Sequence, residues 1–309
     1  MIKKVSLIGL GAIGAAYASR LHKMDSNCLQ VIANEDRIHR YQKNGIMVNG
    51  ERYDFNYRTP FDATEPADLL LISVKYDGLD QALETIQNHV GPNTIIMSLM
   101  NGIASEDIIA EKFGSDQILH AMCVAIDALR TGTTITFTNI GKICFGDTKN
   151  AIESQKVDSV KELFNRASIP YEVPENILHS MWWKFMINVG VNQTSAILNA
   201  PYKVFQQIPE SRELMISAME EVILLAQKNG IQLSKEDLSK FEKILLEDLS
   251  PDGKTSMLQD IEAGRKTEVD YLAGTVSKLG QQLHVPTPIN DMFYQIIKVL
   301  EKKNAHFAQ

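Results

Sequence analysis

The chain has 309 residues, 44% of them hydrophobic and 22% charged, which is ordinary globular composition, and its length favours two domains. The formal net charge of −7 argues against a nucleic-acid partner or a membrane surface, and no run of about 20 apolar residues predicts a membrane span. Cys28, Cys123 and Cys144 are too few and too scattered for a disulfide framework or a metal site, and without a signal-peptide pattern the expected location is the cytoplasm.

The chain begins with the pattern of a dinucleotide-binding turn. Val5–Ile8 is a short apolar strand, Gly9-Leu10-Gly11-Ala12-Ile13-Gly14 completes G-x-G-x-x-G, and Ala15–Lys23 has helical composition. The first glycine permits a tight turn, the second lets backbone approach a pyrophosphate, and the third lets helix and strand pack closely. Free N–H groups at the start of the helix would bind the phosphates. We therefore expect these six residues to bind a dinucleotide. The alternative is a glycine-rich turn in another α/β protein.

The first half of the chain then alternates strand and helix. Further strands are expected at Leu29–Ala33, Leu69–Val74, Thr94–Leu99 and Ile118–Val124, and helices at Arg37–Asn44, Leu79–His89 and Glu106–Lys112. Asn49-Gly50 predicts a hairpin with the arms Ile46–Val48 and Tyr53–Tyr57. Thr133–Phe137 and Lys142–Phe145 predict a second hairpin that closes the sheet. This order predicts an α/β fold that begins with a Rossmann-type doubly wound parallel sheet.

The second half has a different character, because no convincing strand follows Pro170. Tyr171–Pro174 is interpreted as a linker, which gives a dinucleotide-binding domain at 1–172 and an all-helical substrate-binding domain at 173–309. Helical spacing occurs in Asn176–Leu198, Ser211–Asn229, Lys235–Leu249, Thr267–Gln282 and Pro288–Lys303.

The residues after the second strand bear on the choice of nucleotide. An acidic side chain about 20 residues beyond the glycines binds the ribose of NAD, whereas a nearby arginine favours the phosphate of NADP. Asn34-Glu35-Asp36-Arg37 offers both signals, since Asn34 suits either sugar and Arg37 suits a phosphate that Glu35 and Asp36 would repel. The alternative is a solvated turn and helix cap. The residues alone do not decide between the two nucleotides.

The helical half carries a candidate for the chemistry. Lys184, Asn188 and Asn192 recur at every fourth position, which places them along one stripe of a helix beside apolar residues such as Ile187 and Val191. Burying an ammonium and two amides is costly unless they have polar partners, and a bound polar substrate is one such partner. A structural network between helices is the alternative.

At this point the chain resembles a known family, the ketopantoate reductases. The motifs that carry the resemblance are, in chain order, Gly9–Gly14, Val74-Lys75, Met100-Asn101-Gly102, Trp183-Lys184 with Asn188 and Asn192, Ser256–Ile261 and Lys266–Tyr271. They cover nearly the whole chain in the right order. The resemblance implies NADPH-dependent reduction of 2-dehydropantoate to (R)-pantoate, a step in the synthesis of pantothenate and coenzyme A.

The resemblance also implies roles for individual residues. Lys184 is the general acid, and Glu268 lies on the side of the substrate hydroxyl. The implied substrate residues are Asn101, Lys184, Asn188, Asn192 and Ser256. The implied cofactor residues are Gly9, Leu10, Gly11, Ala12, Ile13, Gly14, Asn34, Arg37, Lys75, Asn101 and Glu268. The roles agree with elementary chemistry, because an ammonium can stabilise and then protonate the oxygen of a 2-oxo group that receives a hydride.

Two positions depart from the family pattern. Asn34 stands where many members carry arginine, and Gly253 stands where some carry a substrate-binding asparagine. The second reading is therefore an NAD-dependent enzyme that reduces another branched or aromatic 2-oxo acid, and a third is a non-catalytic dinucleotide sensor. The seven histidines form no ligand pattern, so no metal is expected. The sequence does not reveal the oligomeric state, and a homodimer through the helical domain is our working expectation.

Overall fold

The computed structural model describes residues 1–62, 65–148 and 154–307. The chain divides into two compact units, each with its own hydrophobic core. Met1–Asn101 and Ser105–Ile177 form the N-terminal unit, and Gly102–Ala104 and Leu178–Gln309 form the C-terminal unit.

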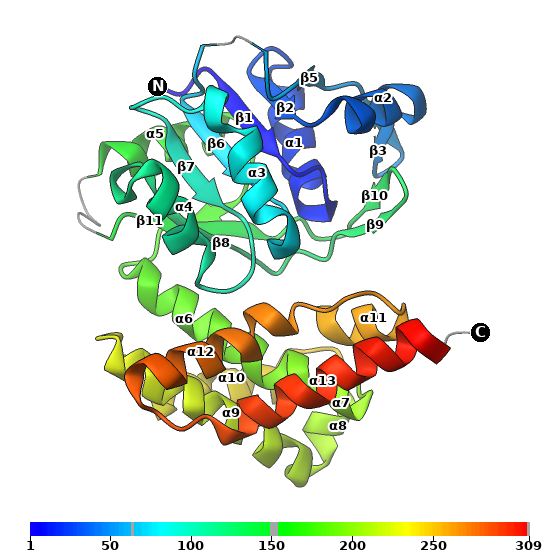
Figure 1. Cartoon of the computed structure of the whole chain (residues 1–309), viewed down its shortest axis with the longest axis vertical. Coiled ribbons are helices and arrows are strands. Elements are labelled where there is room, and N and C mark those ends of the chain that lie inside the picture. The colour runs from blue at the N-terminus through cyan, green and yellow to red at the C-terminus, as the bar shows by residue number, and fades with distance from the viewer. Residues whose placement is uncertain (63–64, 149–153, 308–309) are drawn as a thin grey trace. The chain divides into compact units, whose positions relative to one another are not determined.

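A five-stranded parallel sheet forms the centre of the N-terminal unit (Figure 1). Its strands are β1 (Val5–Ile8), β2 (Leu29–Ile32), β5 (Asn56–Arg58), β6 (Leu69–Ile72) and β7 (Ile95–Ser98). Their order is β5-β2-β1-β6-β7, and every neighbouring pair is parallel. The chain leaves β1 toward one edge and returns to β6 on the other side. The sheet is therefore doubly wound, as predicted, and its switch point lies between β1 and β6.

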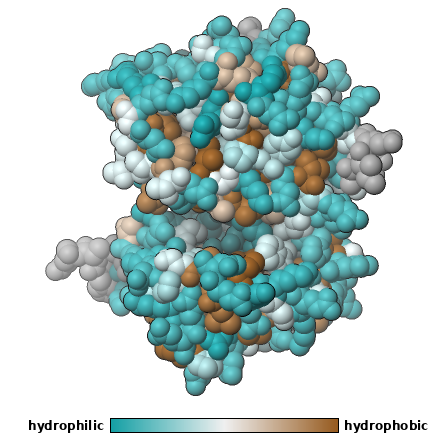
Figure 2. All heavy atoms as spheres, turned by 180° about the vertical axis from the view of Figure 1, so that it is seen from behind, coloured by the Kyte–Doolittle hydropathy of each residue, from teal (hydrophilic) through white to brown (hydrophobic). Residues whose placement is uncertain are grey.

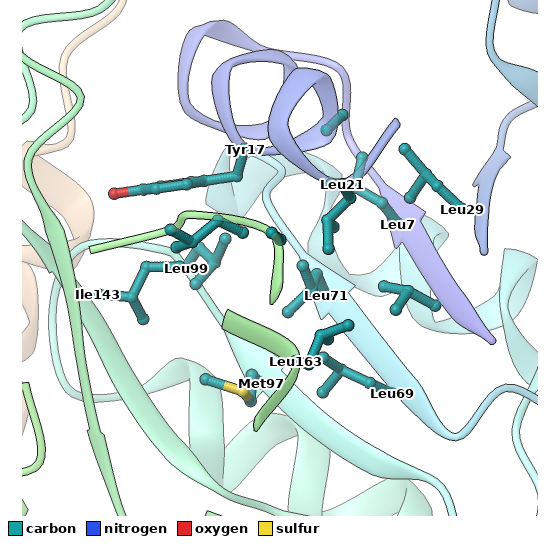
Figure 3. Packing of buried hydrophobic residues seen from close by; sticks show 14 of the residues in the cluster. Leu7, Tyr17, Leu21, Leu29, Leu69, Leu71, Met97, Leu99, Ile143 and Leu163 are labelled. Atoms are coloured by element: carbon teal, nitrogen blue, oxygen red, sulfur yellow. The ribbon is translucent and has the colours of Figure 1, made fainter. Parts of the chain in front are cut away.

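Helices cover both faces of this sheet. They are α1 (Ala12–Met24), α2 (Glu35–Asn44), α3 (Leu79–Thr85), α4 (Ser105–Phe113) and α5 (Gln155–Arg166), with short 3-10 turns at Tyr76–Gly78, Gln87–His89 and Ser115–Gln117. On one face, Leu21 of α1 and Leu163 of α5 share a cluster with Leu7, Leu71 and Met97 of the strands (Figure 3). Full burial of each such side chain contributes roughly 1.5–3 kcal/mol. Figure 1 shows α3 and α4 over the opposite face.

Two smaller sheets complete the N-terminal unit. One has the order β4-β3-β10-β9, and the other has the order β12-β11-β8. The strands are β3 (Ile46–Val48), β4 (Glu51–Tyr53), β8 (His120–Val124), β9 (Leu129–Thr131), β10 (Thr134–Thr136), β11 (Lys142–Gly146) and β12 (Tyr171–Glu172). The expected hairpin of Thr133–Phe137 with Lys142–Phe145 is wrong. A two-residue turn at Gly132, whose φ is 61°, pairs β10 with β9, while β11 pairs with β8.

Two other expectations need correction. The arm Tyr53–Tyr57 is divided, because Tyr53 pairs with β3 whereas Tyr57 pairs in parallel with β2. The hairpin with β3 supplies backbone hydrogen-bond partners at Tyr53 but not at Tyr57. The open edge of β2 supplies them at Tyr57. Tyr171–Pro174 is not simply a linker, because Tyr171–Glu172 forms β12 beside β11.

The described part of the C-terminal unit contains helices and no strand. The helices are α6 (Ile177–Ile187), α7 (Gln193–Leu198), α8 (Tyr202–Gln207), α9 (Pro209–Lys228), α10 (Lys235–Glu247), α11 (Ser256–Glu262), α12 (Ala273–Leu283) and α13 (Pro288–Phe307), with a 3-10 turn at Val269–Tyr271. The expected continuous helix Asn176–Leu198 is interrupted by a π-helical segment, Asn188–Asn192, which we call the π-turn. The helix expected from Thr267 begins only at Ala273.

In Figure 2, the hydrophobic residues on the visible face lie in separate groups among hydrophilic ones. Among the residues that the structure describes, no helix is both long and apolar enough to cross a membrane.

Candidate active site

The residues Gly9–Gly14, which we call the glycine loop, contain two glycines that local packing requires and one that it does not. Gly9 has a φ of +100°, and a Cβ there would lie 2.3 Å from the carbonyl oxygen of Ser73. A Cβ on Gly14 would lie 2.0 Å from the carbonyl oxygen of Gly9. At Gly11 the nearest atom would be 3.8 Å away, an ordinary contact. Packing within the chain therefore explains Gly9 and Gly14 but not Gly11, and close approach of a ligand does explain Gly11.

The start of α1 is suited to an anion. Gly11 is the N-cap residue and has no side chain to cap the helix, and the first turn contains no acidic residue. Its N–H groups and the positive end of the helix dipole are therefore available to a pyrophosphate. The loop fits the dinucleotide that the sequence predicted.

Arg130 is a residue near this loop that sequence reasoning missed. Its Nη1 donates a hydrogen bond to the carbonyl of Leu10, and its Nε donates to the carbonyl of Gly132 at 2.8 Å. The guanidinium on β9 therefore ties the β9–β10 hairpin to the glycine loop and places a positive charge beside it. The contact joins residues 120 positions apart, so no local pattern indicates it.

The end of β2 leads into a hollow of about 330 Å³. It is lined by Asn34, Glu35, Asp36, Thr59, Pro60 and Phe61. Asn34 caps α2, because its side-chain oxygen accepts a hydrogen bond from the backbone N–H of Arg37 at 3.0 Å. Arg37 is exposed in the first turn. Asn34 is therefore a helix cap, and the carboxylates of Glu35 and Asp36 line the hollow.

Lys75 and Asn101 follow the two strands beyond the switch point. Lys75 lies three residues after the end of β6 and is exposed, and Asn101 lies three residues after the end of β7 and is half-buried. The carboxyl ends of parallel strands lie at one edge of a sheet. The glycine loop, Lys75 and Asn101 are therefore at the same edge of the N-terminal unit.

A buried carboxyl group lies behind the Asn101 loop. The hydroxyl of Ser105 donates to Glu106 Oε2 at 2.9 Å, and the hydroxyls of Ser105 and Ser98 are 2.8 Å apart. The backbone N–H of Met100 donates to Ser98 Oγ at 3.3 Å. Burial raises the pKa of Glu106 to about 7, although the bond from Ser105 opposes the rise. This series of hydrogen bonds ends at the backbone N–H of Met100, one residue before Asn101.

In the C-terminal unit, Lys184, Asn188 and Asn192 are all half-buried on α6 and the π-turn. In a continuous α-helix each step of four residues drifts by about 40°, so Asn192 would lie about 80° around the axis from Lys184. A π-turn winds more loosely and reverses part of that drift. Asn192 Nδ2 lies 3.5 Å from Ser256 Oγ at the start of α11. The structure thus brings together two of the predicted substrate residues.

The segment that carries Glu268 is anchored on both sides by α13. The backbone N–H and the hydroxyl of Thr267 donate to Glu301 Oε1 at 2.7 and 2.6 Å. Asp270 accepts hydrogen bonds from Tyr294 at 2.9 Å and from Lys298 at 3.2 Å. Burial opposes ionisation, but these bonds hold the pKa of Asp270 below its usual range. Glu268 itself is half-buried between the two anchors.

Local packing explains why glycine stands at position 253. A Cβ there would lie 2.8 Å from the ring of Tyr202 and 2.9 Å from the carbonyl oxygen of Ser250. An asparagine at this position would require Tyr202 to move. The departure from the family pattern is therefore built into the local packing.

Comparison with known proteins identifies the family. Residues 5–150 match the family model described as Ketopantoate reductase PanE/ApbA, and residues 176–301 match its C-terminal counterpart. The chain belongs to the ketopantoate reductase family. This family is one of oxidoreductases that use nicotinamide dinucleotides, and the resemblance of the sequence is confirmed.

Individual proteins align over nearly the full chain. A 2-dehydropantoate 2-reductase of Streptococcus pyogenes is 24% identical, with 96% of this chain and 97% of that protein covered. The structure of a PanE/ApbA family ketopantoate reductase from Ralstonia eutropha has a TM-score of 0.84 at 22% identity, covering 98% and 100% of the two chains. A D-mandelate dehydrogenase in complex with NADH has a TM-score of 0.85 at 21% identity, covering 97% and 99%. The likenesses to solved structures show a common fold.

Proposed function

We propose that this protein reduces 2-dehydropantoate to (R)-pantoate with NADPH. One observation carries the proposal: Asn192, at the end of the π-turn that follows Lys184 and α6, lies within 3.5 Å of Ser256. An ammonium, two amides and a hydroxyl are the groups that a 2-oxo acid with a hydroxyl needs for its carboxylate, carbonyl and alcohol. Full-length alignment with 2-dehydropantoate 2-reductases supports this substrate.

In the proposed reaction, the C-terminal unit handles the substrate. A bound reduced nicotinamide dinucleotide supplies the hydride that adds to the 2-oxo carbon. The Lys184 ammonium stabilises the negative charge that develops on the carbonyl oxygen and then donates its proton to that oxygen. Glu268 accepts a hydrogen bond from the substrate hydroxyl. Asn188, Asn192 and Ser256 orient the substrate.

The proposed roles in the N-terminal unit follow its geometry. The backbone of Gly9–Gly14 binds the pyrophosphate, and Arg37 pairs with the 2′-phosphate of NADPH. Lys75 and Asn101, at the same sheet edge, bind the nicotinamide half. We propose the corresponding division of labour along the chain, with 1–172 for the cofactor and 173–309 for the substrate.

A second function has its own support. Glu35 and Asp36 line the hollow next to Asn34, where carboxylates suit ribose hydroxyls and disfavour a phosphate. Gly253 leaves no room for the asparagine that some family members use. One solved structure of this fold is a D-mandelate dehydrogenase with NADH. The second candidate is therefore NADH-dependent reduction of another branched or aromatic 2-oxo acid.

One set of assays separates the two functions. Steady-state rates are measured with 2-dehydropantoate and with benzoylformate, each with NADPH and with NADH. The proposal expects the highest kcat/KM with 2-dehydropantoate and NADPH. Turnover of benzoylformate with NADH, and none of 2-dehydropantoate with either nucleotide, would establish the second candidate instead.

A further inference from the structure

The π-turn is held from its buried side by two side chains. Gln193 Nε2 donates to the carbonyl of Val189 at 2.7 Å, and the hydroxyl of Thr194 donates to the carbonyl of Gly190 at 2.8 Å. Gln193 and Thr194 are both fully buried. The π-turn departs from the hydrogen-bond ladder of an α-helix, so donors that reach its carbonyls help to select this conformation.

The side chain of Gln193 also reaches beyond its own helix. Its Nε2 donates to Asn290 Oδ1 at 3.2 Å near the start of α13, and its Oε1 accepts a hydrogen bond from the backbone N–H of Ala273 at 3.0 Å. Ala273 is the first residue of α12 and follows Glu268 by five positions. One buried amide therefore joins the π-turn to the helix that follows the Glu268 segment.

The partner of Gln193 on α13 is itself fixed. Asn290 Nδ2 donates to Glu221 Oε2 at 2.7 Å and to the carbonyl of Ala218 at 3.2 Å. The carboxylate of Glu221 also accepts the backbone N–H groups of Ile289 and Asn290 at 2.8 and 3.0 Å. Every donor in this network meets an acceptor, which fixes the orientation of both amides. A fully satisfied buried network of this kind rigidifies its surroundings.

We propose that Gln193 is a positioning residue of this enzyme. Its side chain keeps the π-turn from rewinding as an α-helix, so Asn188 and Asn192 stay toward the face of Lys184. Through Ala273, it also fixes these asparagines relative to the Glu268 segment. The part that concerns substrate rests on the proposed function, whereas the part that concerns the π-turn does not.

The test compares Gln193→Met with Gln206→Met. Methionine has nearly the same length as glutamine but cannot donate to Val189 or accept from Ala273. Gln206 is a matched control, because its Nε2 also donates to two backbone carbonyls, those of Leu245 and Leu249, both at 2.9 Å. These bonds join α8 to α10 and to the residues just after it, and they do not involve the π-turn. Melting temperature, steady-state kinetics, nucleotide affinity and hydrogen–deuterium exchange are measured on the full-length variants.

For Gln193→Met, we expect kcat/KM for 2-dehydropantoate to fall at least tenfold, mainly through a higher KM. The affinity for NADPH should stay within twofold, because the glycine loop is in the other unit. Exchange in peptides covering 186–194 and 271–276 should accelerate. Gln206→Met should lower the melting temperature without changing kcat/KM or exchange in these peptides.

Unchanged exchange in the π-turn, or a loss of kcat/KM that is equal in the two variants, would overturn the inference. If Gln193→Met does not fold, Thr194→Val removes only the hydroxyl donor to Gly190 and should produce a smaller change of the same kind. A wild-type protein that reduces no 2-oxo acid would contradict the proposed function, and the exchange measurement alone would then decide whether Gln193 holds the π-turn.

Discussion

The side-chain oxygen of Asn34 accepts a hydrogen bond from the backbone N–H of Arg37, at 3.0 Å. This bond caps α2 and fixes Arg37 in the first turn of the helix, next to Glu35 and Asp36. The described residues that line the adjacent hollow include these two carboxylates and no cation. Arg37 is the residue directly after this lining, and we propose that its side chain pairs with a 2′-phosphate bound there.

Arg37→Ala should weaken the binding of NADPH more than that of NADH. The loss of one hydrogen bond to a charged group is worth about 1.5–3 kcal/mol, or one to two decades in affinity. Fluorescence titrations with both nucleotides measure the effect. Arg40→Ala, on the same helix, is the control for charge and should change neither affinity. Equal weakening of the two nucleotides by Arg37→Ala would show that Arg37 does not bind the 2′-phosphate.

Arg130→Ala removes the hydrogen bond to Leu10, on the loop that both nucleotides share. It should weaken the binding of NADPH and of NADH alike.

The glycine loop offers a pair of variants that separates folding from binding. Gly14→Ala should destabilise the protein by about 1–3 kcal/mol, because its Cβ would overlap the carbonyl oxygen of Gly9, only 2.0 Å away. Gly11→Ala should leave the free energy of unfolding nearly unchanged and weaken nucleotide binding. Chemical denaturation without nucleotide, together with nucleotide titration, measures both. A Gly11→Ala protein that loses stability and keeps its affinity would contradict this assignment.

Glu106 should make the stability of the protein depend on pH. Burial raises the pKa of Glu106 from an ordinary 4.5 to about 7. Between these values the folded state binds more protons than the unfolded state, so the free energy of unfolding falls as pH rises. The slope is at most about 1.4 kcal/mol per pH unit, and the dependence ends above the folded pKa.

Glu106→Gln keeps the shape of the side chain and cannot ionise. The free energy of unfolding of this variant, relative to wild type, should increase from pH 5 to pH 7 and then remain constant. Thermal unfolding at a series of pH values measures this difference. Asp107→Asn, at the exposed neighbouring position, is the control and should run parallel to wild type. If Glu106→Gln also runs parallel to wild type, the carboxyl does not titrate in this range.

The parts of the fold that local sequence determines could be predicted. The glycine motif, the strand before it and the helix after it are contiguous, and Gly9 and Gly14 meet through the turn that joins them. The strands β6 and β7 are buried at every position and mostly apolar, which indicates a parallel sheet. The hairpin expected for Lys142–Phe145 was wrong, because its partner β8 lies earlier in the chain than the expected arm.

Features that depend on distant partners could not be predicted. Helical spacing grouped Lys184, Asn188 and Asn192 but gave no sign of the π-turn. The contacts around that turn come from distant residues: Gln193 donates to Asn290, 97 positions away, and Gly190 packs closely against Met219. The spacing suggested the right face of the helix, and tertiary contacts decided how the helix winds.

The most direct test of the proposed chemistry is the turnover of Lys184→Ala with 2-dehydropantoate and NADPH, measured beside NADPH affinity. Loss of the proton donor and of the charge that stabilises the oxyanion should lower kcat by about 10²–10⁴. Lys184→Arg should recover little, because a planar guanidinium neither gives up a proton nor occupies the same point. Lys243→Ala removes a lysine that is exposed on α10 and should have no effect. We expect this loss with NADPH affinity nearly unchanged, and a Lys184→Ala enzyme with near-normal turnover would contradict the proposed role of Lys184.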